Sequence, residues 1–181
     1  MSNGTKVKKR DGRIEPLDLD KMHLMVEEAT KGLAGVSASQ VEMKSGIQFY
    51  DGITTAEIQE ILIRSASDLI DLDHPNYQFV AARLLLFSLR KSLYGKMREL
   101  PHLEAHIMDC TNIDVYDKDI FNKYSKEEID KANSMIDHGR DFDFTYAGLR
   151  QVVDKYLVQD RSSGGVYETP QFMYIMIALT I

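Results

Sequence analysis

The sequence of 181 residues has a single cysteine, no tryptophan and four prolines. One thiol, Cys110, cannot form an internal disulfide, which fits a reducing compartment, and it cannot support a mechanism that needs two or three cysteines of this chain. No apolar run approaches the roughly 18 residues of a membrane span, and the polar start MSNG lacks the features of a signal peptide. We therefore expect a soluble, cytoplasmic protein with no membrane partner.

The composition is that of a folded protein. Hydrophobic residues make up 44% of the chain and charged residues 28%, which excludes disordered, collagen-like and low-complexity classes. The length fits one domain or two small ones. Lys and Arg number 22 against 28 Asp and Glu, a formal net charge of −6, which argues against bulk nucleic-acid binding but leaves room for a local basic patch.

Basic residues gather at the start of the chain, at Lys6, Lys8, Lys9, Arg10 and Arg13. They surround Asp11-Gly12, a pair typical of a two-residue hairpin turn in which both central residues take positive φ. We expect its strands over residues 6–10 and 13–17. Because an isolated hairpin is marginal in water, it must pack on other structure.

Capping residues and apolar spacing predict four helices after the hairpin. They start at Asp18 or Asp20, at a Ser37–Gln40 capping box, at a Thr54–Glu57 capping box, and at Pro75 for a helix over residues 75–94. Gly32 and Gly35 end the first of these helices and Gly95 the last. A hairpin and four helices predict a self-sufficient first domain over residues 1–95.

Residues 96–181 are expected to form a separate, mostly helical segment. Helices are predicted over 101–110, after a Ser125–Glu128 capping box, after Thr145 and from Thr169-Pro170, with short strands at 156–158 and 166–167. The acidic run 114–119 is most simply a solvated loop. The last helix is apolar on every side and must be buried by other protein, so we expect a fragment or one piece of a larger assembly.

The first domain contains the parts of a nucleotide pocket. Lys9 and Arg10 lie next to a helix start, Thr54 and Thr55 lie at another, and residues 87 and 91 place an aromatic ring and an ammonium on one face of the fourth helix. Phosphate favours clustered cations and free N–H groups, and a base favours an apolar slot. The residues alone leave two interpretations open, a nucleotide site or a solvated hairpin that protects a sheet edge.

Two groups of motifs are similar to one known family. In the first half they are VKKRDG at 7–12, Glu15, DK at 20–21, QVE at 40–42, IQFYDG at 47–52 and AAR at 81–83. In the second half they are IDH at 136–138, Asp141, FTYA at 144–147, KYLVQ at 155–159, YE at 167–168 and QF at 171–172. The first group resembles the ATP-cone domain. Both together resemble the start of the aerobic (class Ia) ribonucleoside-diphosphate reductase large subunit.

The resemblance implies a mainly α fold, with a short β-hairpin over a four-helix bundle as ATP-cone, followed by a helical segment that packs on a catalytic barrel. It also implies an overall-activity switch in which ATP activates and dATP inhibits, each bound with Mg²⁺ as an allosteric effector. Lys9, Arg10, Thr55 and Lys91 would lie near the phosphates. The nucleotide-binding residues that it implies are Val7, Lys9, Arg10, Glu15, Leu17, Asp18, Lys21, Met22, Thr55, Gln59, Phe87 and Lys91.

Two positions depart from the family pattern. Residue 59 is Gln where a histidine is frequent, and residue 18 is Asp where an asparagine is usual. Gln59 can form hydrogen bonds but cannot become cationic, and Asp18 adds a negative charge near the nucleotide. We hypothesise that both changes reduce inhibition by dATP.

The resemblance places the barrel and the specificity site beyond residue 181, so no catalytic residue is expected in this chain. Cys110 matches none of the cysteines that carry the radical or the redox chemistry. The chain would be an inactive regulatory part of a thioredoxin- or glutaredoxin-dependent reductase. Its partners would be the remainder of the large subunit, in the same or a separate polypeptide, a radical-generating small subunit and a second large subunit. The alternative is a free-standing cone that senses nucleotides or regulates transcription; a zinc ribbon or a DNA-reading helix would favour it, and the sequence shows neither.

Other polar clusters have simpler explanations. His102, His106 and Cys110 have the spacing of zinc ligands on a helix, but a fourth ligand is not apparent, so no metal site is expected. His138 is expected to be a loop histidine hydrogen-bonded to its own turn. Met173 and Met176 are expected to pack in the core.

Overall fold

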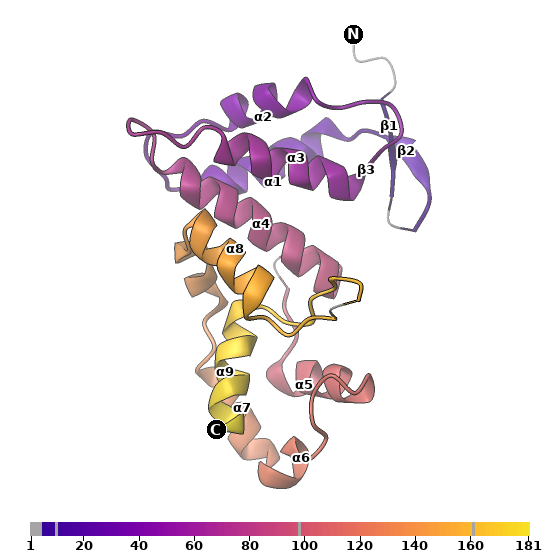
Figure 1. The fold of residues 1–181 in the computed structure, drawn as a ribbon, viewed down its shortest axis with the longest axis vertical. Coiled ribbons are helices and arrows are strands. Elements are labelled where there is room, and N and C mark those ends of the chain that lie inside the picture. The colour runs from indigo at the N-terminus through magenta and orange to yellow at the C-terminus, as the bar shows by residue number, and fades with distance from the viewer. Residues whose placement is uncertain (1–4, 10, 98, 161) are drawn as a thin grey trace. The chain divides into compact units, whose positions relative to one another are not determined.

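The structure, a computed structural model, describes residues 5–9, 11–97, 99–160 and 162–181 (Figure 1). The chain divides into two compact units, residues 1–88 with 144–149 and residues 89–143 with 150–181. The described residues are mainly helical, with a small three-stranded sheet, which confirms the expected fold class. The domain boundary near residue 95 stays a prediction.

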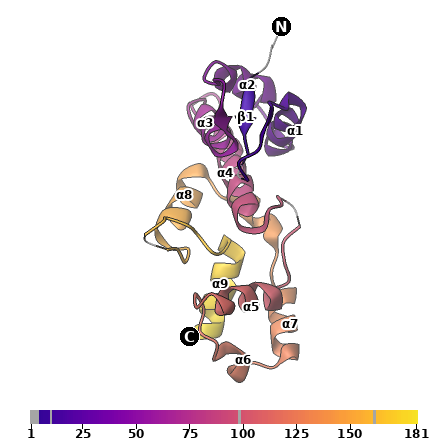
Figure 2. The same ribbon diagram turned by 90° about the vertical axis from the view of Figure 1, so that its right-hand side faces the viewer.

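The sheet of the first unit has the order β2-β1-β3. The hairpin strands β1 (Lys6–Lys8) and β2 (Ile14–Pro16) are antiparallel, and β3 (Ile53–Thr54) pairs with β1 in parallel. In the view of Figure 2, α1 and α3 flank β1. The sequence analysis did not predict β3, because two residues are too few to show an alternating pattern and their partner lies about 45 positions away in the sequence.

The hairpin turn differs from the expected one. The strands are shorter than predicted, and Gly12 has a positive φ of 87° whereas Asp11 does not. The Lys9 carbonyl accepts the Gly12 N–H at 3.0 Å, and the Lys9 N–H donates to the Arg13 carbonyl at 2.8 Å. This pattern belongs to a longer loop with glycine in the left-handed position, so the two-residue turn was wrong. Arg10 lies outside the described residues.

Four helices complete the first unit: α1 (Leu19–Thr30), α2 (Ala38–Gly46), α3 (Thr55–Ser67) and α4 (Tyr77–Tyr94), which continues into the second unit. Both halves of the Thr54–Glu57 capping box are present. The Ser37–Gln40 box is absent. The Tyr77 hydroxyl instead accepts the Ser37 N–H at 3.0 Å and donates to the Gln40 side chain at 2.5 Å. A tyrosine 40 positions after Ser37 thus replaces the local cap, which the local pattern could not show.

The second unit contains α5 (Leu103–Asn112), α6 (Ile120–Lys123), α7 (Lys126–Ser134), the 3₁₀ helix η1 (His138–Asp143), the end of α8 (Tyr146–Lys155) and α9 (Pro170–Thr180). The Ser125–Glu128 capping box is confirmed. The Thr145 hydroxyl accepts the Gly148 N–H at 3.2 Å, which confirms the cap of α8. The two short strands expected near 157 and 166 reduce to a single bridge between Gln159 and Val166.

Helix α9 packs one face on the core of the second unit. Phe172, Met173 and Met176 are buried, as expected, whereas Tyr174 and Ile177 are 49% and 47% exposed. The core around this face also contains Leu103, Ile107, Ile120, Ile129 and Ala132. Among the described residues, no helix has the length and apolar content that crossing a membrane requires.

Candidate nucleotide-binding site

The third strand brings the start of α3 next to the hairpin. Val7, which is 2% exposed, pairs with Glu15 on one side and with Ile53 on the other, and Lys8 pairs with Thr54. Because β1 and β3 run in parallel, the residues that directly follow them, Lys9 and Thr55, leave the sheet at the same end. Thr55 is the first residue of α3, where backbone N–H groups and the helix dipole favour an anion.

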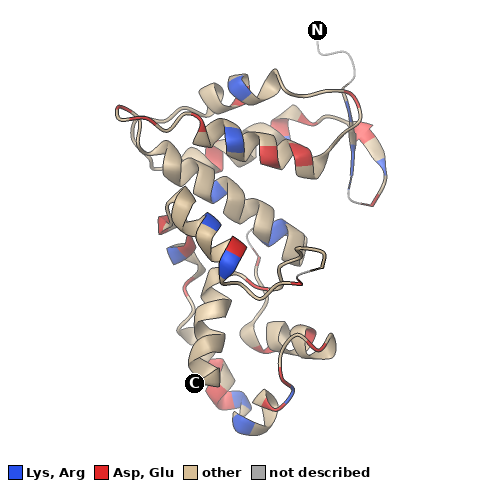
Figure 3. Cartoon of the chain, viewed as in Figure 1, with Lys and Arg blue, Asp and Glu red and all other residues tan. Residues whose placement is uncertain are grey.

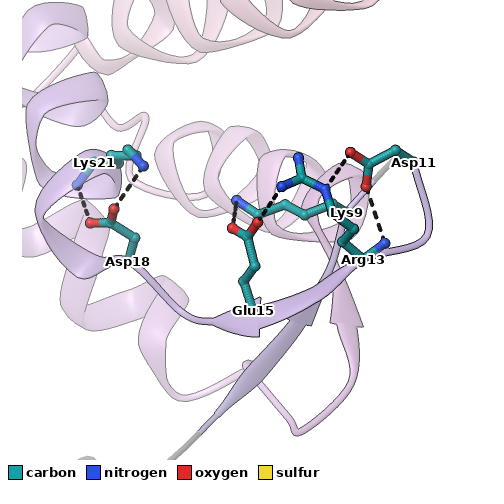
Figure 4. A network of polar contacts seen from close by, with 6 residues as sticks. All are labelled: Lys9, Asp11, Arg13, Glu15, Asp18 and Lys21. Carbon is teal, nitrogen blue, oxygen red and sulfur yellow. Dashed lines mark hydrogen bonds and ion pairs between the residues drawn. The ribbon is translucent and has the colours of Figure 1, made fainter.

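Two cations of the hairpin, Lys9 and Arg13, are ion-paired (Figure 4). The two carboxylate oxygens of Glu15 contact Lys9 Nζ at 3.3 Å and Arg13 Nη1 at 3.0 Å. Arg13 Nε also donates to Asp11 at 2.7 Å. The backbone N–H of Arg13, and then its side chain, lower the pKa of Asp11, and Asp11 raises the pKa of Arg13. Anionic and cationic residues alternate from Asp11 through Arg13 to Glu15, whereas β1 carries only cations, Lys6 and Lys8 (Figure 3).

Asp18 and Lys21 form a second pair, at the start of α1. The Asp18 carboxylate accepts the Lys21 N–H at 3.0 Å and contacts Lys21 Nζ at 3.0 Å. The backbone N–H bond, followed by the side-chain bond, lowers the pKa of Asp18. The carboxylate of Asp18 therefore caps this helix. An asparagine at this position could cap the helix in the same way but would carry no charge.

Helices α3 and α4 contribute the buried part of the candidate site. Gln59 lies one turn after Thr55, is 5% exposed, and accepts a hydrogen bond from the Ser88 hydroxyl at 3.0 Å. Phe87, next to Ser88, is 2% exposed. Lys91 follows one turn later on α4, in the stretch that belongs to the second unit. Gln59 is thus held as a neutral hydrogen-bonding group between two helices.

Leu17 follows β2 directly, and Met22 lies on α1. Both line a cavity of about 590 Å³, together with Thr5 and Pro16 of the hairpin and with residues of α1, α2 and the segment after α2. The lining of this cavity includes neither Lys9 nor Thr55. The cavity therefore lies between the base of the hairpin and helices α1 and α2.

Two functional candidates were missed by the sequence analysis. Arg13 shares the Glu15 carboxylate with Lys9, and Ser88 fixes the amide of Gln59. The position of Arg13 just after Asp11-Gly12 was the available signal, since a basic residue there lies across the loop from Lys9. No sequence pattern links Ser88 to Gln59.

The histidines of the second unit serve its packing. His106 and Cys110 are buried, while His102 is exposed at the start of α5, where it accepts the Glu104 N–H at 3.3 Å. His102, Glu104 and Asp130 have ligand atoms within 4.8 Å of one another, but Lys126 Nζ contacts Glu104 at 2.6 Å and Asp130 at 3.6 Å. The ammonium group of Lys126 therefore already contacts both carboxylates.

The expected hydrogen bond between the His138 ring and its own turn is not found at Nδ1. Its ring packs edge-on against Phe172, with 5.0 Å between centroids, and its buried Nδ1 has no hydrogen-bond partner among the described residues. Its carbonyl accepts Arg90 Nη2 at 2.7 Å. The residue is part of the interior of the second unit.

Comparison with known families defines the class of protein. The ATP cone domain matches residues 5–92, and the ribonucleotide reductase all-alpha domain matches residues 142–181. The chain thus carries an ATP cone followed by a stretch of the ribonucleotide reductase all-alpha domain.

The chain is also similar to individual proteins, all of them ribonucleoside-diphosphate reductase alpha subunits. The chain is 46% identical over 178 residues to "Ribonucleoside-diphosphate reductase 1 subunit alpha" of Escherichia coli K12, a match that covers 98% of this chain and 23% of that protein. It is 44% identical over 181 residues to "Ribonucleoside-diphosphate reductase subunit alpha" of Haemophilus influenzae, a match that covers 100% of this chain and 24% of that protein. It is 43% identical over 149 residues to the subunit alpha of Enterobacteria phage T4, a match that covers 81% of this chain and 20% of that protein. The chain therefore spans about a quarter of the length of these relatives and corresponds to their N-terminal region.

Proposed function

We propose that this chain is the regulatory N-terminal region of a ribonucleoside-diphosphate reductase alpha subunit. Binding of ATP or dATP to the cone would control the reduction of ribonucleoside diphosphates to deoxyribonucleotides. The match of residues 5–92 to the ATP cone, in one chain with the reductase all-alpha domain, carries this proposal. A free-standing cone is disfavoured by the second of these matches.

The described residues fit a nucleotide triphosphate. Lys9 follows β1, and Thr55 follows the neighbouring parallel strand β3 as the first residue of α3, a helix start that suits phosphates. Phe87 is a buried aromatic residue of α4. Mg²⁺ would be carried by the phosphate oxygens. The nucleotide-binding residues remain those that the family pattern indicates: Val7, Lys9, Arg10, Glu15, Leu17, Asp18, Lys21, Met22, Thr55, Gln59, Phe87 and Lys91.

The chemistry of reduction would belong to the remainder of the alpha subunit, whether on the same or a separate polypeptide. A radical-generating small subunit and a second alpha subunit would complete the enzyme. Cys110 is not suited to thiol chemistry, because burial raises the pKa of its thiol to about 11 and so keeps it protonated. The cytoplasmic location stays a prediction.

Calorimetric titration of the chain with Mg²⁺-ATP and Mg²⁺-dATP tests nucleotide binding. We expect saturable binding of both, weakened at least tenfold by Lys9→Gln. Lys44→Gln, which removes a cation from α2 of the same unit, is the matched control and should bind like wild type. Absence of any adenine-nucleotide binding by the folded chain would overturn the regulatory assignment.

We also propose that inhibition by dATP is weak in this protein. Gln59 stays neutral at any pH, and the carboxylate of Asp18 lies at the start of α1. In the assembled reductase, dATP should leave substantial activity, and the variants Gln59→His and Asp18→Asn should increase inhibition. Complete inhibition of the wild-type enzyme by dATP would refute this proposal.

A further inference from the structure

His23 of α1 lies between two carboxylates, one on its own helix and one on α2. Its Nδ1 lies 2.7 Å from an oxygen of Glu42 on α2, and its Nε2 lies 3.2 Å from an oxygen of Glu27, one turn later on α1. An ionised carboxylate only accepts hydrogen bonds, and a neutral imidazole carries a single N–H. Both contacts can therefore be hydrogen bonds only when the ring carries two N–H groups, as it does in its cationic form.

The contact with Glu42 joins two helices that pack on each other. Helices α1 and α2 are in contact, and their buried residues include Val26 of α1 and Val41 of α2. His23 lies one turn before Val26, and Glu42 directly follows Val41, so the ion pair lies at the edge of the apolar contact. The side chains of His23 and Glu42 are 48% and 21% exposed. Protons from the solvent therefore reach the imidazole.

The charges around His23 favour its cationic form. In the described lining of the 590 Å³ cavity, the only titratable side chains are Asp20 and His23 from α1 and Glu42 from α2. The base of the hairpin and the segment after α2 add none to this lining. The hydrogen bond with Glu42, followed by the charge of Glu42 and with a smaller contribution from Glu27, raises the pKa of His23. All of the charges that face the imidazole here are negative.

We propose that His23 is a proton-dependent latch between α1 and α2. In its cationic form the imidazole binds Glu42 and holds the two helices together beside the cavity. In its neutral form one ring nitrogen presents a lone pair to a carboxylate oxygen, and the bond at the other nitrogen is no longer assisted by a positive charge. Helix α2 then separates from α1 more easily. The latch needs no nucleotide, so it stands apart from the proposed regulatory function.

The pH dependence of this latch is opposite to that of the histidines in the second unit. The pKa of His23 is raised in the folded chain, so its stabilising effect is fully present below the unfolded pKa of about 6.5 and is lost as the pH rises through the folded pKa. Burial lowers the pKa of His106 and of His138 to about 4, so their effect on stability is lost as the pH falls. Loosening of α2 at alkaline pH can therefore be assigned to His23.

Two measurements on the nucleotide-free chain test the latch. An NMR titration of wild type follows the two ring nitrogens of His23, which gives its pKa and shows whether both carry a proton at low pH. Amide hydrogen exchange of α2, expressed as protection relative to the intrinsic exchange rate at each pH, is then measured one pH unit below and one above that pKa.

Three variants complete the design. His23→Gln cannot titrate, and Glu42→Gln keeps the size of the side chain but removes its charge. His74→Gln is the matched control, because His74 also contacts a carboxylate, that of Asp71 at 3.1 Å, but within the single loop between α3 and α4.

We expect the pKa of His23 in wild type to lie above the ordinary histidine value of about 6.5 and to fall toward that value in Glu42→Gln. The protection of α2 in wild type should decrease about two- to fivefold from the lower to the higher pH, the size of effect that an exposed ion pair supplies. This decrease should be absent in His23→Gln and unchanged in His74→Gln.

A pKa of His23 at or below about 6.5 in wild type would overturn the proposal. The same decrease in α2 protection in wild type and His23→Gln, or no decrease in wild type, would also overturn it. If a variant fails to fold, the titration and the exchange measurement on wild type still decide, since neither needs a substitution.

Discussion

Acidification should destabilise the second unit through His106. The imidazole of His106 is 2% exposed and stacks on Phe172, with 4.2 Å between centroids and 9° between planes. Its Nε2 lies 3.1 Å from the hydroxyl of Tyr116, which donates its proton to Glu168 and so leaves its oxygen to accept from Nε2–H. Tyr94 of α4, Cys110 of α5 and His138 of η1 are the other titratable groups around it. This environment holds a neutral imidazole.

The magnitude follows from the pKa of His106, which burial lowers to about 4, with a smaller contribution from His138. An unfolded histidine has a pKa of about 6.5. The folded state therefore binds fewer protons, and the stability is fully present above pH 6.5 and lost as the pH falls toward 4. Linkage through His106 alone gives a loss of about 2 kcal/mol in the free energy of unfolding between pH 7 and pH 5. Burial also lowers the pKa of His138 to about 4, which acts in the same direction.

Urea unfolding of the chain at pH 7, 6 and 5, followed by circular dichroism, measures this loss. Burial raises the pKa of Glu168, which acts in the opposite direction, so the informative quantity is the difference between wild type and His106→Gln. Gln keeps a donor near Tyr116 but does not titrate. The variant should lose about 2 kcal/mol less than wild type over this range. Equal pH dependence in the two proteins, or an NMR pKa of His106 above 6, would refute the reasoning.

Three further outcomes test the fold. Thr54→Ala removes half of the capping box of α3 and should lower the free energy of unfolding by about 1 kcal/mol in urea titrations. Arg90→Met leaves the buried carboxylate of Asp141 without its partner at 2.9 Å and should cost about 3–5 kcal/mol, of which a second change, Asp141→Asn, should recover part; no recovery would contradict the pairing. Cys110, with a thiol pKa raised by burial to about 11, should react with iodoacetamide far more slowly in the native chain than in urea; equal rates would contradict its burial.

Local chemistry was predictable from the sequence. The capping boxes at Thr54 and Ser125 form as expected, because a side-chain oxygen and a carboxylate three residues later bond the same turn in almost any context. Gly12 and Gly95 take the positive φ that their positions required. These signals depend on neighbours within one turn, so tertiary structure had little opportunity to override them.

Non-local contacts were not predictable. The Ser37 cap is displaced by Tyr77, and Arg90 pairs with an aspartate 51 residues away. In the candidate site, Lys9 and Thr55 were proposed from their places beside helix starts, and Glu15 through the family resemblance. That Lys9 and Arg13 share the Glu15 carboxylate depends on the strand register. A pattern along the chain gives residue types and faces, whereas pairing across elements requires the fold.

At the hairpin, the local arrangement of charges matters more for anion binding than the net charge of the chain. The net charge of −6 opposes anion binding in bulk, but at physiological salt charges farther than a Debye length of about 8 Å are largely screened. An anion near the hairpin therefore experiences the local charges, in which Lys9 and Arg13 are balanced by Asp11 and Glu15 while Lys6 and Lys8 add positive charge. This part of an acidic chain is thus locally cationic, which the net charge alone does not show.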